Sequence, residues 1–227
     1  MECIFNWSGG KDSALALFKL REEKRYNIRY LLTTLNAEFK RISMHGVRLE
    51  LLQQQAKSID IPLIEAYLPE KASCEDYNSL MNETLIKLMV EGIHYSAFGD
   101  IFLDDLKLYR ENQLTKIGMN AIFPLWKRDT KEVAHEFIDR GFKSIITCVD
   151  SRLLDKSFVG RTFDNQFLSD LPLNIDPCGE NGEFHSFVVD GPIFNTPIQC
   201  SLGEIVYKSY PINGKDENGF WFIDLVQ

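Results

Sequence analysis

The sequence predicts an α/β protein with a doubly wound, parallel, five-stranded sheet, followed by a smaller C-terminal α+β part. Three observations lead to this fold class. Short β-rich segments alternate with helix-like segments up to about residue 150, which is the order of a parallel sheet covered on both faces. A glycine-rich turn separates the first strand from the first helix. Beyond residue 150 the chain becomes turn-rich, so we expect domains at 1–150 and 151–227.

The predicted strands of the sheet are short apolar runs that end abruptly at polar or glycine-containing turns. The first ends at Ser8-Gly9-Gly10 and the fourth at Gly99-Asp100. The carboxyl ends of parallel strands meet at one edge of the sheet, so we expect these two turns to lie close together. The five predicted strands cover residues 2–7, 28–35, 62–67, 95–98 and 143–149.

Apolar residues at helical spacing predict five helices between these strands. Thr130 is positioned to cap the last of them and Gly141 to end it. The predicted helices cover residues 11–23, 50–59, 77–91, 104–118 and 130–140.

The C-terminal part begins with two short helical pieces and a segment rich in Gly, Pro, Asn and Asp at 174–183. Three strand-like segments follow, at 184–189, 204–210 and 220–226. Asn213-Gly214 and Asn218-Gly219 lie between the last two, which indicates a hairpin.

The composition narrows the classes of function. The 227 residues carry a formal net charge of −8, whereas a protein that wraps nucleic acid usually has a basic surface. No apolar run approaches the roughly 20 residues of a membrane span. No basic region precedes an apolar one at the N-terminus, so we expect no signal peptide. The five cysteines form no C-x-x-C pair, which is typical of reduced thiols in a cytoplasmic protein.

The most informative segment stands between the first strand and the first helix, and it predicts an anion site. Two glycines let the backbone bend and bring its N–H groups close to a phosphate, and the helix that follows points its positive end at the same spot. Hydroxyls and an ammonium group add donors, while the carboxylate suits a Mg²⁺ ion held beside phosphates. The segment is Ser8-Gly9-Gly10-Lys11-Asp12-Ser13.

This segment resembles the S-G-G-x-D-S signature of the PP-loop ATP pyrophosphatases, whose fold is Rossmann-like. That resemblance implies that the loop grips the pyrophosphate end of ATP and that the substrate becomes adenylated. Four further segments, in this order, are similar to the diphthine–ammonia ligase family: 41–48, 99–101, 123–126 and 179–185.

The resemblance to this family implies a reaction and its partners. ATP would activate a carboxylate as an acyl-adenylate, and ammonia or an amine would displace AMP to form an amide. The expected ligands are ATP, Mg²⁺ and a carboxylate-bearing acceptor of unknown identity. Nucleic acid and membrane are not expected, and a homo-oligomer stays open.

Further candidate residues follow the second and fourth strands. Asp100 fits a catalytic residue that orients the substrate or a metal, and equally a solvated cap. Thr34 and Asn36 end the second strand, where the nucleoside of a bound nucleotide usually lies. Arg41, His45 and Arg48 come after that strand, and their charges suit an anionic substrate.

Glu180, Glu183 and His185 lie in or next to the glycine-rich segment near residue 180. Two carboxylates and an imidazole can position ammonia, bind Mg²⁺ or act as a base, whereas the alternative is a polar turn before a strand. The family resemblance favours a catalytic role. Cys178 is interpreted as structural, because no third group supports a nucleophile.

Two other functions remain as alternatives to the ligase. The first is RNA modification, which several PP-loop enzymes perform, although thiolation commonly needs paired cysteines. The second is a nucleotide-binding sensor without catalysis, although a sensor need not keep both Lys11 and Asp12. Within the family pattern, His185 stands where an acidic residue is expected, which favours an acceptor more anionic than diphthine.

Overall fold

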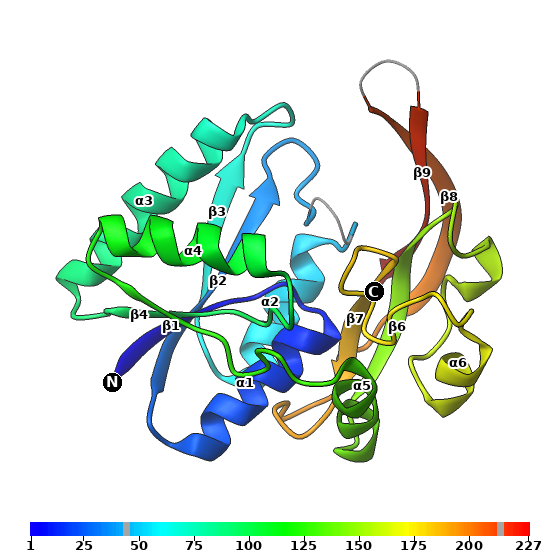
Figure 1. Ribbon diagram of the computed structural model, residues 1–227, viewed down its shortest axis with the longest axis horizontal. Coiled ribbons are helices and arrows are strands. Elements are labelled where there is room, and N and C mark those ends of the chain that lie inside the picture. Colours follow the sequence, from blue (N-terminus) through cyan, green and yellow to red (C-terminus); the bar gives the residue numbers. More distant parts are fainter. Residues whose placement is uncertain (43–45, 213–215) are drawn as a thin grey trace.

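The computed structural model describes residues 1–42, 46–212 and 216–227 of the chain (Figure 1). The described residues form two sheets and the helices that pack against them. The first is parallel with strand order β3-β2-β1-β4-β5, and the second is antiparallel with order β7-β6-β9-β8. This confirms the predicted α/β class, the five-stranded parallel sheet and the separate C-terminal part.

The parallel sheet and its helices occupy the N-terminal part of the chain. β1 lies at the centre, with β2 on one side and β4 on the other, so the strand order reverses direction there. The elements are β1 (Glu2–Asn6), α1 (Lys11–Glu23), β2 (Asn27–Asn36), α2 (Leu49–Ile59), β3 (Leu63–Leu68), α3 (Cys74–Val90), β4 (Tyr95–Ala97), α4 (Asp104–Lys116) and β5 (Asn120–Ile122).

The identity of the fifth parallel strand differs from the prediction. β5 is a three-residue strand, Asn120–Ile122, that pairs with β4. The predicted fifth strand forms β6 (Lys143–Asp150) instead, which pairs antiparallel with β7 and β9 in the second sheet. The division of the chain at residue 150 stays a prediction.

The C-terminal elements form the antiparallel sheet and the short helices at its edge. Asp129 caps α5, where Thr130 was predicted, because the Asp129 carboxylate accepts from the N–H groups of Lys131 and Glu132. The elements are α5 (Thr130–Asp139), β6, η1 (Lys156–Phe158), α6 (Asn165–Asp170), β7 (Phe184–Asp190), β8 (Ser201–Ile212) and β9 (Asp216–Val226).

The predicted hairpin is present as β8 and β9. Asn218-Gly219 lies within β9 and pairs with Tyr210 and Ser209, so it forms no turn. Asn213-Gly214 lies outside the described residues.

Two apolar cores hold these layers together. Ile4 and Leu32 point from the parallel sheet into a core beneath α3 and α4. Their neighbours Phe5 and Leu31 point to the opposite face, because successive strand residues alternate. The second core contains α1, α2 and α5 and continues into the antiparallel sheet, and Figure 1 shows α1 and α2 between the two sheets. The start of α1 is therefore packed between the two sheets.

Among the described residues, every helix is too short or too polar to cross a membrane.

Candidate active site

Residues 8–13, called the phosphate loop after their predicted role, connect β1 to the first turn of α1 at the carboxyl edge of the parallel sheet. The Ser8 and Ser13 hydroxyls lie 3.0 Å apart, and the Gly10 N–H donates to the Ser8 hydroxyl at 3.3 Å. Asn6 ties the end of β1 to β4, since its amide donates to the Ala97 carbonyl at 2.9 Å. The loop thus presents hydroxyls and N–H groups at a helix N-terminus, which is the chemistry of an anion site.

Two glycines allow close packing around the loop. Gly9 has a φ of +76°, and a side chain there would come within 2.8 Å of Gln55 and Leu52. Gly99 follows β4, and a side chain there would come within 2.9 Å of the Ser13 backbone nitrogen. Only glycine therefore lets the end of β4 lie against the start of α1.

Lys11 extends from the loop toward the C-terminal part and is only 4% exposed. Its ammonium group donates to both Asp12 carboxylate oxygens, at 2.8 and 3.1 Å, and to the Cys178 carbonyl. It also lies 5.2 Å from the centre of the Phe184 ring. Burial opposes its charge, but the Asp12 carboxylate and other groups outweigh this effect and raise the pKa of Lys11. Lys11 therefore stays charged and joins the two parts of the molecule.

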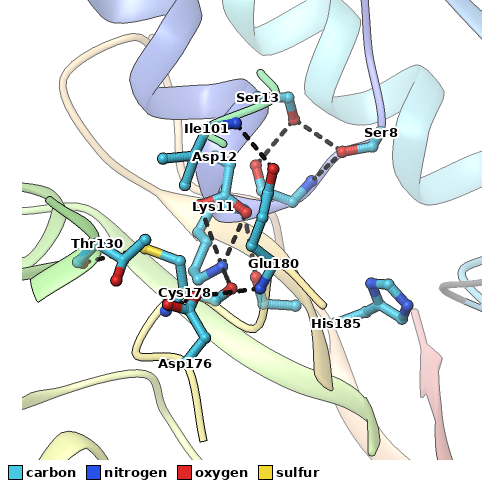
Figure 2. Close-up of polar contacts among 12 residues, drawn as sticks. Ser8, Lys11, Asp12, Ser13, Ile101, Thr130, Asp176, Cys178, Glu180 and His185 are labelled. Atoms are coloured by element: carbon cyan, nitrogen blue, oxygen red, sulfur yellow. Dashed lines mark hydrogen bonds and ion pairs between the residues drawn. The ribbon is translucent and has the colours of Figure 1, made fainter. Parts of the chain in front are cut away.

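Glu180 approaches the same loop from the C-terminal part (Figure 2). Its carboxylate accepts from the Ile101 N–H at 2.8 Å, beyond the end of β4. Burial raises the pKa of Glu180 to about 7; the hydrogen bond from Ile101 opposes the shift and the Asp12 charge adds to it. A carboxyl group with such a pKa exchanges its proton near neutral pH, as a general base does.

The segment that carries Glu180 is fixed by its own hydrogen bonds. The Asp176 carboxylate accepts from the N–H groups of Cys178, at 2.9 Å, and Glu180, at 3.2 Å. Glu183 is 3% exposed, and it accepts from the Asp176 N–H at 3.2 Å and the Asn181 amide at 2.9 Å. Burial raises the pKa of the Cys178 thiol, so this cysteine stays protonated.

A cavity of 430 Å³ opens at the carboxyl edge of the sheet, between the loop and the C-terminal part. The predicted residues that line it come from the loop after β1, the start of α1, β2, the turn after β4, the segment near residue 180 and the start of β7. They are Ser8, Gly10, Lys11, Asp12, Ser13, Thr34, Asp100, Glu180 and His185. In Figure 2, His185 stands apart from the Lys11, Asp12 and Glu180 cluster.

Comparison with known protein families identifies the family of this chain. The profile of the diphthamide synthase N-terminal domain matches residues 1–121, and that of the diphthamide synthase C-terminal domain matches residues 129–223. The chain belongs to the diphthamide synthase family. The first match ends in β5 and the second begins just before α5, and residues of both matched regions line the cavity of this family member.

Curated relatives support this membership and confirm the predicted resemblance. The chain is 29% identical to the human diphthine–ammonia ligase over 140 residues, which are 60% of this chain and 51% of that protein. It is 23% identical to the zebrafish (Danio rerio) diphthine–ammonia ligase over 187 residues, 79% of this chain and 72% of that protein. The chain thus spans about half the length of the human relative.

A solved structure, the U34-tRNA thiolase NcsA from Methanococcus maripaludis, is a weaker match. It aligns with 61% of this chain and 57% of its own chain, at 17% identity and a TM-score of 0.40.

Several predicted site residues of this family member lie away from the cavity. Asn36 forms a turn instead, since its side-chain oxygen accepts from the N–H groups of Glu38 and Phe39, both at 2.9 Å. Gly9 and Glu183 are packed behind the cavity wall and do not line it. Their predicted roles in binding or catalysis stay predictions.

The cationic residues predicted after the second strand are Arg41, His45 and Arg48, and the two arginines form ion pairs. Arg41 lies 2.9 Å and Arg48 2.5 Å from the carboxylate of Asp224 in β9. Their hydrogen bonds and charges hold the pKa of Asp224 well below its usual range. Neither arginine lines the cavity, so both charges are neutralised outside it. His45 lies outside the described residues.

The cavity also contains residues that the sequence alone did not single out. Arg110 of α4 reaches Asp100, with Nε 2.6 Å from the carboxylate, and lies 4.3 Å from the centre of the Phe98 ring. Ser186 of β7 accepts from the Lys11 N–H at 3.2 Å. Arg110 lies inside a helix, ten residues after Asp100, and nothing in the local sequence marks it as a partner.

The protein side chains alone do not form a metal centre. Within residues 1–42, 46–212 and 216–227 no group of three His, Cys, Asp or Glu side chains is arranged to hold a metal ion. Asp12 is the one predicted metal ligand in the phosphate loop, and Lys11 occupies both its oxygens.

Proposed function

We propose that this chain is an ATP-dependent ligase that activates a carboxylate as an acyl-adenylate and joins it to ammonia or an amine, with release of AMP and pyrophosphate. The observation that carries the proposal is one cavity shared by the phosphate loop, Glu180 and His185. One side of this cavity suits an anion and the other offers groups for proton transfer. The activity named for the relatives supports the same reaction.

The phosphate loop would bind the β- and γ-phosphates of ATP and leave the α-phosphorus open to attack. Ser8, Gly10 and Ser13 would donate to phosphate oxygens, while Lys11 would balance the negative charge that develops on pyrophosphate. Thr34, at the end of β2, would contact the nucleoside.

Magnesium fits this site as an ion that arrives with ATP. Mg²⁺ commonly takes one or two protein carboxylates and completes its shell with phosphates and water, and Asp12 offers one carboxylate. The ion would supply charge neutralisation on the phosphates. Asp12 would exchange part of its contact with Lys11 for this role.

Glu180 would act at the second half of the reaction. Ammonia and most amines are protonated at neutral pH, and only their unprotonated forms attack an acyl-adenylate. A buried carboxylate with a pKa near 7 can take that proton, which leaves ammonia free to attack the acyl carbon. Asp100 would orient the acceptor through its pair with Arg110.

Diphthine is the first acceptor to test, because the relatives are diphthine–ammonia ligases. Of the residues that favour a more anionic acceptor, His185 lines the cavity, and His45 lies outside the described residues. Arg41 and Arg48, which also favoured it, are paired with Asp224 away from the cavity. The carboxylate of Glu180 also lines the cavity and suits a cationic group on the acceptor, whereas Asp12 and Asp100 are paired with Lys11 and Arg110.

The protonation of three buried cysteines argues against a sulfur-transfer reaction. Burial raises the pKa of the Cys3 thiol to about 12 and that of Cys148 further still, so these thiols stay protonated. Cys178 lines the cavity but is protonated for the same reason. A sulfur transfer that used one of these cysteines as the nucleophile would need its thiolate form.

Product analysis tests the reaction class. With ATP, ammonium and diphthine-bearing elongation factor two, turnover should yield equal amounts of AMP, pyrophosphate and amide. Anion-exchange chromatography separates AMP from ADP, and labelled ammonium marks the amide. Formation of ADP and phosphate, or ATP cleavage without any amide product, would contradict the proposal.

A further inference from the structure

Gln55 is a fully buried polar residue on α2, in the middle of an apolar helix face. Its neighbours on that face, Leu51, Leu52 and Ile59, belong to the core between the two sheets. A buried side-chain amide costs free energy unless its hydrogen bonds are made, so its contacts need an explanation.

The Gln55 amide makes three hydrogen bonds, and each goes to a different part of the site. Its oxygen accepts from the indole N–H of Trp7 at 2.9 Å, and its nitrogen donates to the carbonyls of Gly9, at 3.1 Å, and Val188, at 2.6 Å. One side chain thus links the end of β1, the phosphate loop and β7.

The carbonyl of Gly9 is held by two donors. Besides Gln55, the Val188 N–H donates to it at 2.9 Å. The peptide between Gly9 and Gly10 is trans, so this carbonyl and the N–H of Gly10 point in opposite directions. Gly10 lines the cavity and its N–H points to the Ser8 hydroxyl, whereas Gly9 faces α2 and β7.

The orientation of the Gly9–Gly10 peptide determines whether the loop presents an N–H group or a carbonyl oxygen to an anion. If the peptide turned over, the Gly9 carbonyl would face the cavity, and its negative end would repel phosphate. Glycines on both sides permit such a turn, because they allow many backbone conformations. Two donors on the Gly9 carbonyl oppose it.

We propose that Gln55 is a positioning residue, which fixes the Gly9–Gly10 peptide so that the Gly10 N–H faces the phosphate of ATP. The inference rests on the proposed function for the identity of the anion, and on the contacts of Gln55 for the geometry. Because Gln55 also holds Val188, it fixes the loop relative to the C-terminal sheet that carries His185 and Ser186.

The test compares Gln55→Glu with Gln53→Leu. A glutamate at position 55 keeps an oxygen for the Trp7 indole and, in its ionised form, offers no donor to either carbonyl. Gln53 is an exposed glutamine on the same helix that donates to Glu65 at 2.8 Å, so its replacement is a matched control. Gln55→Leu, which carries no charge, is measured beside them, and each variant is checked by thermal unfolding.

In Gln55→Glu, the KM for ATP should rise roughly 10-fold or more, because two carbonyls lose a buried donor. The KM for the acceptor should stay close to that of the wild type. The Gly10 amide resonance of the ligand-free protein should shift, while the Trp7 indole resonance stays. Gln53→Leu should change none of these values.

The outcomes separate this inference from the proposed function. A folded Gln55→Glu or Gln55→Leu variant with wild-type affinity for ATP and an unchanged Gly10 resonance would overturn the role of Gln55. If the wild type bound no ATP, the proposed function would fail, and the Gly10 resonance would still decide whether Gln55 orients the peptide.

Discussion

Asp12→Asn should lower the rate of AMP formation by about 10²-fold or more, because the loop loses the carboxylate that balances Lys11 and would hold the metal. Asparagine has nearly the same volume and keeps an oxygen for the Lys11 ammonium, so the fold should persist. Initial rates of pyrophosphate release, measured at saturating ATP, check this expectation.

Asp170→Asn is the matched control for Asp12→Asn. Asp170 lies 2.6 Å from Arg161 outside the cavity, so its replacement also removes an ion pair. We expect wild-type turnover from this variant. Wild-type turnover from Asp12→Asn, with an unchanged melting temperature, would remove Asp12 from the site.

Glu180→Gln should lower the rate of amide formation with ammonium by about 10²-fold or more, since the base is lost. In the wild type, at constant ammonium, the rate should rise with pH and level off above about 7, as Glu180 loses its proton. This limb should disappear in the variant, whose remaining rate should follow the fraction of free ammonia and so keep rising above pH 7. Hydroxylamine is largely unprotonated at neutral pH and needs no base, so it should restore much of the lost rate. The pH profile of amide formation with each nucleophile provides the measurement.

The stability of Glu180→Gln separates lost chemistry from lost folding. The pKa of Glu180 is raised in the folded protein, so its contribution to stability falls as pH rises from its ordinary pKa to about 7. Glutamine removes this decrease and still accepts from the Ile101 N–H, so the variant should be at least as stable as the wild type above pH 7.

Glu183→Gln is the comparison for this experiment, because it changes the same charge three residues away and outside the cavity. We expect it to keep the pH limb. If the limb disappears in Glu183→Gln and persists in Glu180→Gln, the base is Glu183.

Local sequence patterns were sufficient to predict the phosphate loop and most of the parallel sheet. The phosphate loop is contiguous, and strands that alternate with helices predicted the parallel sheet. β5 was missed because three residues carry no periodic signal. β6 was assigned to the wrong sheet because an apolar strand after a helix looks the same in either sheet, and only its distant partners β7 and β9 determine its place.

Partners far away in the sequence explain the remaining differences at the site. Arg48 looked free to bind an anion, but its partner Asp224 is 176 residues away. Family resemblance alone indicates Glu180 and His185, since nothing in their spacing shows that they lie at the same cavity as the phosphate loop. The sequence contains one indication that Gln55 is important, because this polar side chain lies on an otherwise apolar helix face.

The fate of the acceptor oxygen tests the central claim most directly. The carboxylate of the acceptor is labelled with a heavy oxygen isotope, and the products with ATP and ammonium are analysed by mass spectrometry. An acyl-adenylate passes one carboxylate oxygen to the α-phosphate when ammonia attacks, so each amide formed should be matched by one labelled AMP, with unlabelled pyrophosphate. Unlabelled AMP, or label in inorganic phosphate, would contradict adenylation of the carboxylate.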